Sequence, residues 1–244
     1  MPAGFSIEVI NISSTTLKII ALITMIMDHV GVVFFNDNIF MRAIGRISFP
    51  LYIITFADGY IKTSNRKAFF KRVFVMACIS QPFYLLNFSS YFHSVKNLNI
   101  LFTFLVAFAA LMAGDNLHSI KSKGMDKLLI YFVAVVLGDV LRLDYGSIGI
   151  ASIILAVEMA RSQKFGNSKL KYIFPVLIEM LSVLTAWKSH LLVLLAGHIA
   201  ALVIAVMYNS EYGFSSKNRL LKNFLSISYP LHLALIFATK IILL

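Results

Sequence analysis

Long apolar runs separated by short polar segments repeat along the whole chain. A membrane-spanning helix needs about 20 mostly apolar residues, and nine segments approach this length. They cover residues 17–36, 40–60, 70–88, 98–115, 127–141, 146–160, 172–187, 190–208 and 221–243. The pattern therefore predicts an all-α, polytopic membrane protein with about nine transmembrane helices.

The fifth, sixth and seventh segments are short for a complete crossing, so one could be re-entrant or two could form a broken pair. The polar connections are compact and include no linker long enough to divide domains, so residues 1–244 are expected to form a single domain. The first segment is too long for the core of a signal peptide and lacks a small-residue cleavage site. We expect it to be retained as a helix.

Composition supports a membrane protein, because 59% of the residues are hydrophobic, 14% are charged and the mean hydropathy is +0.83. A soluble domain of this length cannot hide so much apolar surface. The single cysteine, Cys78, excludes an intramolecular disulfide, and no Cys/His spacing typical of a metal site occurs. We therefore expect no metal cofactor.

Basic residues predict the orientation of the chain. The connections after the second, fourth, sixth and eighth segments, together with the segment ends next to them, carry fifteen Lys and Arg residues, whereas the alternate connections and their adjoining ends carry four. Because positive loops stay inside, this asymmetry places the N-terminus in the cytoplasm and the C-terminus outside the cell (inner) membrane. The net charge of +11 reflects this signal and attraction to anionic lipid, so no nucleic-acid partner is expected.

Asp28 and His29 interrupt the apolar run of the first segment, LITMIMDHVGVVFF. Ionisable groups inside a bilayer are costly and are usually functional. With a rise of about 1.5 Å per residue, His29 lies about 18 Å from the cytoplasmic face, nearly level with Arg46. Asp139 and His232 fall at the same depth. Three interpretations stay open: a structural ion pair, a proton relay or substrate site of a transporter, and a catalytic site.

Lys18 and His29 are eleven residues apart, which is three helical turns, so they share one face of the first helix. Lys18 lies at the cytoplasmic mouth, about 16 Å along the axis from His29. Coenzyme A fits this arrangement, since its phosphates and its thioester are joined by a long thin arm. The alternative is a snorkelling lysine that marks the membrane boundary.

The second segment places Arg42 and Arg46 one turn apart on one face, which is repulsive unless an anion or a carboxylate lies between them. Pro50 removes a helical hydrogen bond to the carbonyl of Arg46 and predicts a kink there. A similar motif, ISYPLH, brings Tyr229 and His232 beside a proline in the ninth segment.

Seven motifs occur in order along the chain: LKIIALITMIMDHVG, MRAIGRISFPLYIITFADGYIKT, ISQPFYLLNF, LNILFTFLVAF, LDYGSIGI, YNSEYG and SYPLHLALI. With them the chain resembles the TraX family, which is named for a protein that acetylates pilin. That family is related to membrane acyltransferases whose first helix carries a basic residue, ten others and a histidine, as Lys18 and His29 do. The chain departs from the pattern in ADGY, where Asp58 replaces the usual Glu, and in YNSEYGFSSKNR, where the basic pair is displaced to Lys217 and Arg219.

The resemblance implies transfer of an acetyl group from cytoplasmic acetyl-CoA to an amine or hydroxyl acceptor, such as a peptide N-terminus or a sugar. Such a site needs a base or an acyl carrier and a stabiliser of the thioester oxyanion. His29 suits the first role, with Asp28 and Arg46 orienting it or stabilising charge. The alternative function is a small proton-coupled transporter or flippase.

The remaining candidates fall into two groups. The first group would bind the cofactor, and it consists of Lys18, Lys217, Arg219 and Asn209. The second group would bind the acceptor, and it consists of Arg42, Asp58, Asp144, Tyr229 and His232.

Overall fold

The computed structural model describes residues 11–92, 97–117, 123–162, 169–186, 191–211, 213 and 218–243. The regular elements of these ranges are helices, accompanied by two isolated β-bridges. The helices are α1 (Ser14–Phe34), α2 (Ile39–Gly45), α3 (Ser48–Lys62), α4 (Arg66–Phe92), α5 (Ile100–Asn116), α6 (Lys123–Val140), α7 (Gly146–Arg161), α8 (Leu170–Ala186), α9 (Leu191–Met207) and α10 (Arg219–Leu243).

Each apolar segment expected from the sequence corresponds to a helix, except that the second is divided into α2 and α3. The break falls at Arg46 and Ile47, between the end of α2 and the start of α3. Pro50 explains it, because proline has no N–H to donate to the carbonyl four residues earlier. The kink predicted at Arg46 is thus confirmed. The short segments five to seven form the continuous helices α6, α7 and α8.

Four helical stretches are long and apolar enough to cross a membrane: Ser14–Phe34, Ile39–Lys62, Arg66–Tyr91 and Leu220–Leu243. The apolar helices α5 and α9 are shorter, at 17 residues each. Length and composition therefore indicate a membrane protein. The number of nine crossings and the orientation of the termini stay predictions of the sequence.

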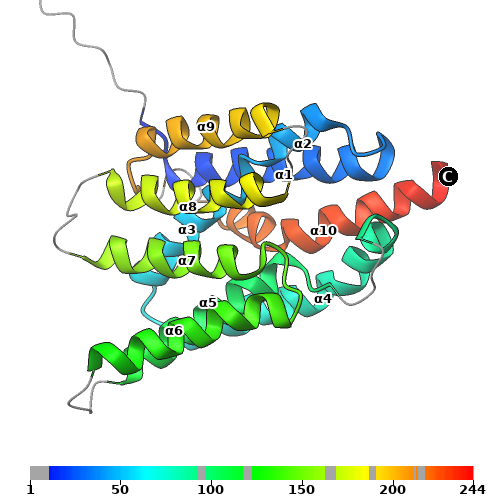
Figure 1. The fold of residues 1–244 in the computed structure, drawn as a ribbon. Coiled ribbons are helices and arrows are strands. Elements are labelled where there is room, and N and C mark those ends of the chain that lie inside the picture. The colour runs from blue at the N-terminus through cyan, green and yellow to red at the C-terminus, as the bar shows by residue number, and fades with distance from the viewer. Residues whose placement is uncertain are drawn as a thin grey trace, which may run out of the picture.

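The helices lie side by side in one bundle and alternate in direction (Figure 1). Helices α1, α4, α6, α8 and α10 run one way, and α3, α5, α7 and α9 run the other way. The alternation follows from the short connections, because each helix begins at the end of the bundle where the helix before it stopped.

Helix α3 lies at the centre of the bundle. It packs against α1, α7, α8 and α9, and Tyr52 contacts all three of the larger hydrophobic clusters. In the most apolar part of Ile39–Lys62, 56% of the residues are buried, compared with 28–33% in the other three long stretches. A central helix can present side chains to an interior cavity as well as to its neighbours.

Large apolar side chains cover the outer surface of the bundle. On α6, Leu128, Phe132, Val136 and Val140 recur at helical spacing and are each 45% exposed or more. Comparable side chains are exposed on α4, α9 and α10. Soluble monomers rarely expose apolar patches of this extent, so the surface suits contact with lipid.

The connection between α6 and α7 is held firmly against the start of α5. The backbone N–H of Leu98 donates to the carbonyl of Arg142 (3.1 Å), and the N–H of Asp144 donates back to the carbonyl of Leu98 (3.1 Å). The hydroxyl of Thr103 also donates to the carbonyl of Asp144 (2.5 Å). These bonds fix Asp144 and Tyr145 in place at the end of the bundle interior.

Candidate functional site

A cavity of about 1070 Å³ lies inside the bundle, lined by α1 to α5, α10 and the connection between α6 and α7. It is at the upper end of the range for ligand sites, about 300–1000 Å³. Lys18 and His29 both line it, so the face of α1 that carries them is the face turned to the cavity. The two residues therefore reach one continuous space, about 16 Å apart along the helix.

Four cations line the cavity on the side of Lys18: Lys18 from α1, Lys62 from α3, Arg72 from α4 and Lys222 from α10. Each lies near the end of its helix that the charge pattern assigns to the cytoplasm. Lys62, Arg72 and Lys222 are among the fifteen basic residues that predicted the orientation, and the sequence pattern gave them no binding role. Because they are predicted at the same end of the bundle as Lys18, they could have been grouped with it.

The other predicted cofactor residues do not line the described cavity. Lys217 lies outside the described residues, and Arg219 begins α10 without a described side chain. Asn209 donates its N–H to the carbonyl of Ile12 (3.1 Å) and accepts at Oδ1 from the N–H of Glu211 (3.0 Å). Asn209 thus shapes the turn that holds residues 208–211 against the chain before α1.

Asp58 is buried and tied to the same segment rather than to the cavity. Its Oδ2 accepts from Lys62 Nζ (3.0 Å), the Tyr208 hydroxyl (2.5 Å) and the Ser210 hydroxyl (2.5 Å), and its Oδ1 accepts from the Tyr172 hydroxyl (3.3 Å). Asp58 therefore joins α3, α8 and the connection before α10, and it holds Lys62 at the cavity mouth.

At the deep end, Asp28 lies between the two arginines. Its Oδ2 accepts from Arg42 Nη1 (2.9 Å), and its Oδ1 lies 3.6 Å from Arg46 Nη2. Arg42 also contacts Asp37 (3.1 Å), which accepts from the Tyr91 hydroxyl (3.2 Å). The carboxylates of Asp28 and Asp37 thus offset the repulsion expected between Arg42 and Arg46.

His29 points away from this ion-pair cluster and meets His232 of α10. Its Nδ1 lies 2.8 Å from His232 Nε2, and the two rings are stacked with centroids 5.0 Å apart. His232 Nδ1 lies 3.0 Å from the carbonyl of Ser228, and Phe88 packs on His29 with centroids 4.9 Å apart. Among the described residues, His29 Nε2 has no hydrogen-bond partner. The depth arithmetic placed His29 and His232 level, and the structure brings them into contact.

Asp144 and Tyr145 line the cavity close to Arg46. The Arg46 guanidinium lies 5.6 Å from the centre of the Tyr145 ring, which packs on Phe49 with centroids 4.0 Å apart. Burial raises the pKa of Asp144 to about 6, although the positive charge of Arg46 opposes the shift. Tyr145 adopts a left-handed backbone (φ 60°), which is strained for a tyrosine and typical of functional positions. Its place in LDYGSIGI was the available signal.

The remaining candidates separate by contact with the cavity. Asp139 caps α7 by accepting from the N–H of Ser147 (2.8 Å) and is not a lining residue. Of the residues expected to bind an acceptor, three line the cavity and two do not: Arg42, Asp144 and Tyr229 do, whereas Asp58 and His232 do not. Within the described ranges, no group of three or more His, Cys, Asp or Glu side chains could hold a metal ion.

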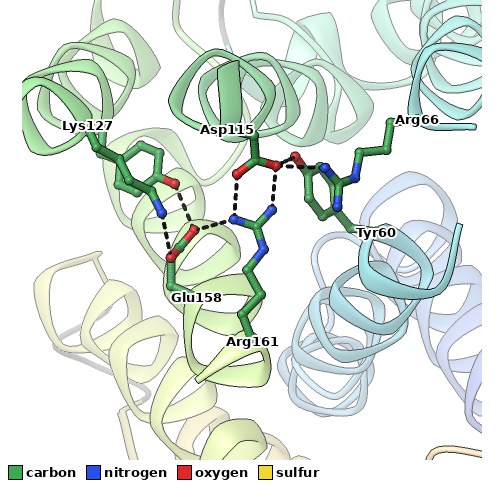
Figure 2. Close-up of polar contacts among 7 residues, drawn as sticks. Tyr60, Arg66, Asp115, Lys127, Glu158 and Arg161 are labelled. Atoms are coloured by element: carbon green, nitrogen blue, oxygen red, sulfur yellow. Dashed lines mark hydrogen bonds and ion pairs between the residues drawn. The ribbon is translucent and has the colours of Figure 1, made fainter. Parts of the chain in front are cut away.

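A second polar network lies outside the cavity, where α3, α4, α5 and α7 meet (Figure 2). Asp115 accepts from both guanidinium nitrogens of Arg161 (2.7 Å each), from Arg66 (2.9 Å) and from the Tyr60 hydroxyl (2.8 Å). The Arg66 guanidinium also lies 4.6 Å from the centre of the Tyr60 ring. One carboxylate therefore joins four helices at this end of the bundle.

Glu158 extends the network to α6. It accepts from Arg161 (2.9 Å), Lys127 Nζ (2.8 Å) and the Tyr131 hydroxyl (2.8 Å). Figure 2 shows Arg161 between the two carboxylates, facing Asp115 on one side and Glu158 on the other. These residues hold helix ends together and leave the cavity to other side chains.

A fully buried polar contact joins α8 to α9. Glu179 Oε2 contacts His198 Nε2, and His198 Nδ1 lies 3.1 Å from the carbonyl of Leu194, an acceptor. His198 follows Gly197, where α9 packs closely on Ala43 and Arg46 of the second apolar segment.

The fold and the polar cavity together define a helical membrane protein with a ligand-sized site inside its bundle. The chain belongs to the TraX family, since the family model described as TraX protein matches residues 13–239. The resemblance inferred from the motifs is thereby confirmed.

One curated relative is the probable fimbrial assembly protein FimC, serogroup H1, of Dichelobacter nodosus. The two are 29% identical over 125 residues, a match that covers 47% of this chain and 51% of the relative. The matched part is therefore about half the length of that relative. No solved structure matches the chain.

Proposed function

We propose that this protein is a membrane acetyltransferase that moves an acetyl group from cytoplasmic acetyl-CoA to an amine or hydroxyl acceptor. The observation that carries the proposal is the single cavity that joins four cations to the imidazole of His29. Cations bind phosphate and imidazole exchanges protons near neutral pH, so the two ends of the cavity suit the two ends of acetyl-CoA.

The cation end would hold the nucleotide and the diphosphate. Lys18, Lys62, Arg72 and Lys222 come from four different helices and surround the mouth, which suits an extended polyanion. The pantetheine arm would follow the face of α1 for about 16 Å to reach His29. The cavity walls between these points include Met25, Thr55 and Phe56, which suit a mostly apolar arm.

At the deep end, His29 Nε2 would take a proton from the acceptor while the nitrogen or oxygen of the acceptor attacks the thioester carbon. The carbon–sulfur bond then breaks, and the same imidazole returns the proton to the leaving thiolate. Arg42 and Arg46 would stabilise the negative oxygen that forms during attack, because both line the cavity beside His29.

The acceptor would enter from the opposite end, between Tyr91, Asp144 and Tyr145. Nine crossings with a cytoplasmic N-terminus would put that end outside the inner membrane. The name of the Dichelobacter relative concerns fimbrial assembly, which favours a protein N-terminus as the acceptor.

The alternative function, a proton-coupled transporter, would use the same buried charges. Transporters of that kind pair interrupted helices at matching positions in two halves of the fold. In the described part of the chain, a helix break within one apolar segment occurs at Arg46 and Ile47, and α10 continues through Pro230. This unpaired break favours the enzyme.

Acetyl-CoA binding to the purified protein tests the cation end. Acetyl-CoA should raise the melting temperature, and added salt should reduce the rise. Lys222→Gln and Arg72→Gln should each weaken binding, whereas Lys67→Gln, a matched change next to the cavity, should not, since Lys67 does not line it. Equal effects of all three substitutions, or no stabilisation at millimolar acetyl-CoA, would contradict the proposal.

A further inference from the structure

We infer that His232 is a positioning residue that fixes the tautomer of His29 and leaves His29 Nε2 as the base that faces the cavity. This inference rests on the proposed function, and it assigns to His232 a role other than contact with the acceptor. The carrying observation is a chain of two hydrogen bonds, from His29 through His232 to the backbone of α10.

The donor and acceptor of each hydrogen bond follow from the carbonyl of Ser228, where the two-bond chain ends. The carbonyl of Ser228 can only accept, so His232 must carry its proton on Nδ1 (3.0 Å from that oxygen). A neutral His232 then has a lone pair on Nε2, which accepts from His29 Nδ1 at 2.8 Å. His29 is therefore protonated on Nδ1, and its Nε2 carries the lone pair.

The neighbouring carboxylate cannot replace His232 in this role. Asp28 directs both oxygens to Arg42 and Arg46 rather than to the imidazole pair. Neighbouring positions on a helix point about 100° apart, so Asp28 and His29 serve separate partners. Within the described residues, His232 is the hydrogen-bonding group that orients the ring of His29.

Packing keeps His232 in position. The side-chain amide of Asn87 donates to the carbonyl of Leu233 (2.9 Å) and joins α4 to α10 beside His232. The Phe88 ring packs at a tilt against the His29 ring, and Tyr229 packs edge-on against His232. Side chains of α4 and α10 therefore pack around the imidazole pair.

The arrangement has a chemical consequence for transfer. When His29 Nε2 gains the proton of the acceptor, the imidazolium keeps its Nδ1–H bond to His232 Nε2, and this neutral acceptor stabilises the charge without removing it. The proton on Nε2 remains available for the thiolate. A neutral acceptor orients the base as the aspartate of a serine hydrolase triad does, but raises its basicity less.

Substitution of His232 tests the role. His232→Ala should lower kcat about 10²–10⁴-fold with an unchanged KM for acetyl-CoA, because it removes a partner of the base and leaves the cation end intact. His232→Gln should restore much of the rate, since its amide oxygen can accept from His29 Nδ1. An active His232→Ala, or a folded His232→Gln that is as inactive as His232→Ala, would overturn the inference.

A second measurement tests the tautomer of His29 without enzyme turnover. Nitrogen-15 NMR of histidine-labelled protein, assigned with His29→Ala, should show His29 as the Nδ1–H tautomer, and His232→Ala should convert it to a mixture. The measurement needs no substrate, so it tests the positioning role of His232 even if no acetyl transfer is found. A wild-type His29 that carries its proton on Nε2 would overturn the inference.

Discussion

Two adjacent residues of α1 have different partners in the interior of the bundle. Asp28 binds the arginines of the second apolar segment, whereas His29 meets the histidine of α10 and the cavity. The division follows from helix geometry, since neighbouring side chains point about 100° apart. Replacing either residue should therefore have separate consequences.

Replacing His29 with alanine should abolish acetyl transfer and leave the protein folded. Lys18 and the other cations of the mouth lie about 16 Å away and would still bind acetyl-CoA. The measurement is transfer of labelled acetyl groups alongside the thermal shift by acetyl-CoA. Normal transfer by a folded His29→Ala protein would refute the mechanism.

Replacing Asp28 with asparagine should lower both activity and stability. The change leaves the buried cations Arg42 and Arg46 with less opposing charge, since only Arg42 also contacts Asp37. Loss of one partner from a buried pair costs about 3 kcal/mol or more. Unfolding in denaturant should show this loss, and equal stability of Asp28→Asn and wild type would argue against a buried ionised pair.

Binding of a cationic acceptor should depend on Asp144 and on pH. Burial raises the pKa of this carboxyl to about 6, so Asp144 is ionised above that pH and neutral below it. A non-reactive peptide analogue with a free amino group should therefore bind more weakly as the pH falls through about 6. Titrations at several pH values measure this, and Asp144→Asn should bind weakly with no such step. A step that persists in Asp144→Asn would assign the titration to another group.

Secondary-structure elements are held at one end of the bundle by carboxylates that each bind several helices. Asp115 joins α3, α4, α5 and α7, and Glu158 adds α6. Asp58 does the same for α3, α8 and the connection before α10. Close packing at Gly45 has a similar effect, because a Cβ there would overlap the Asp28 carboxylate.

Replacing Asp115 with asparagine should destabilise the bundle without affecting the cavity. The change removes charged hydrogen bonds from Arg161 and Arg66, and a loss of about 1–3 kcal/mol is expected. The matched control is Glu211→Gln at an exposed position. Melting temperatures report stability, and the thermal shift by acetyl-CoA should stay the same. A melting temperature equal to that of the control would show that the network adds nothing to stability.

The whole molecule combines an apolar outer surface with an interior whose apolar packing is interrupted by a polar cavity, whereas a soluble bundle has a polar outer surface. Large apolar side chains on α4, α6, α9 and α10 face outward, while charged groups of α1 and α2 line a cavity near the centre. An outer surface of this kind suits contact with lipid.

Topology reporters test the orientation of the whole chain. A reporter fused after Leu244 should be active only outside the inner membrane, and one inserted near Lys121 only in the cytoplasm, because the basic connections predict these sides. A periplasmic phosphatase and a cytoplasmic fluorescent protein provide opposite readouts at each position. The reverse pattern at both positions would place the cation mouth outside and contradict a cytoplasmic source of acetyl-CoA.

Local sequence determined the helices, the break at Arg46 and the shared face of Lys18 and His29. These features depend on the helical period and on the missing N–H of Pro50, which act over a few residues. The apolar excess likewise indicated a membrane protein.

Only the tertiary structure decided which polar side chains contact one another. His29 and His232 are 203 positions apart, and Asp58 lies 150 positions from Tyr208, so no local period could join them. The same holds for Lys62, Arg72 and Lys222, which were visible as charges but became one mouth only when α3, α4 and α10 packed around α1. The physical reason is that a helical period states which face of a helix is polar, whereas the partner of that face depends on the packing of all the helices together.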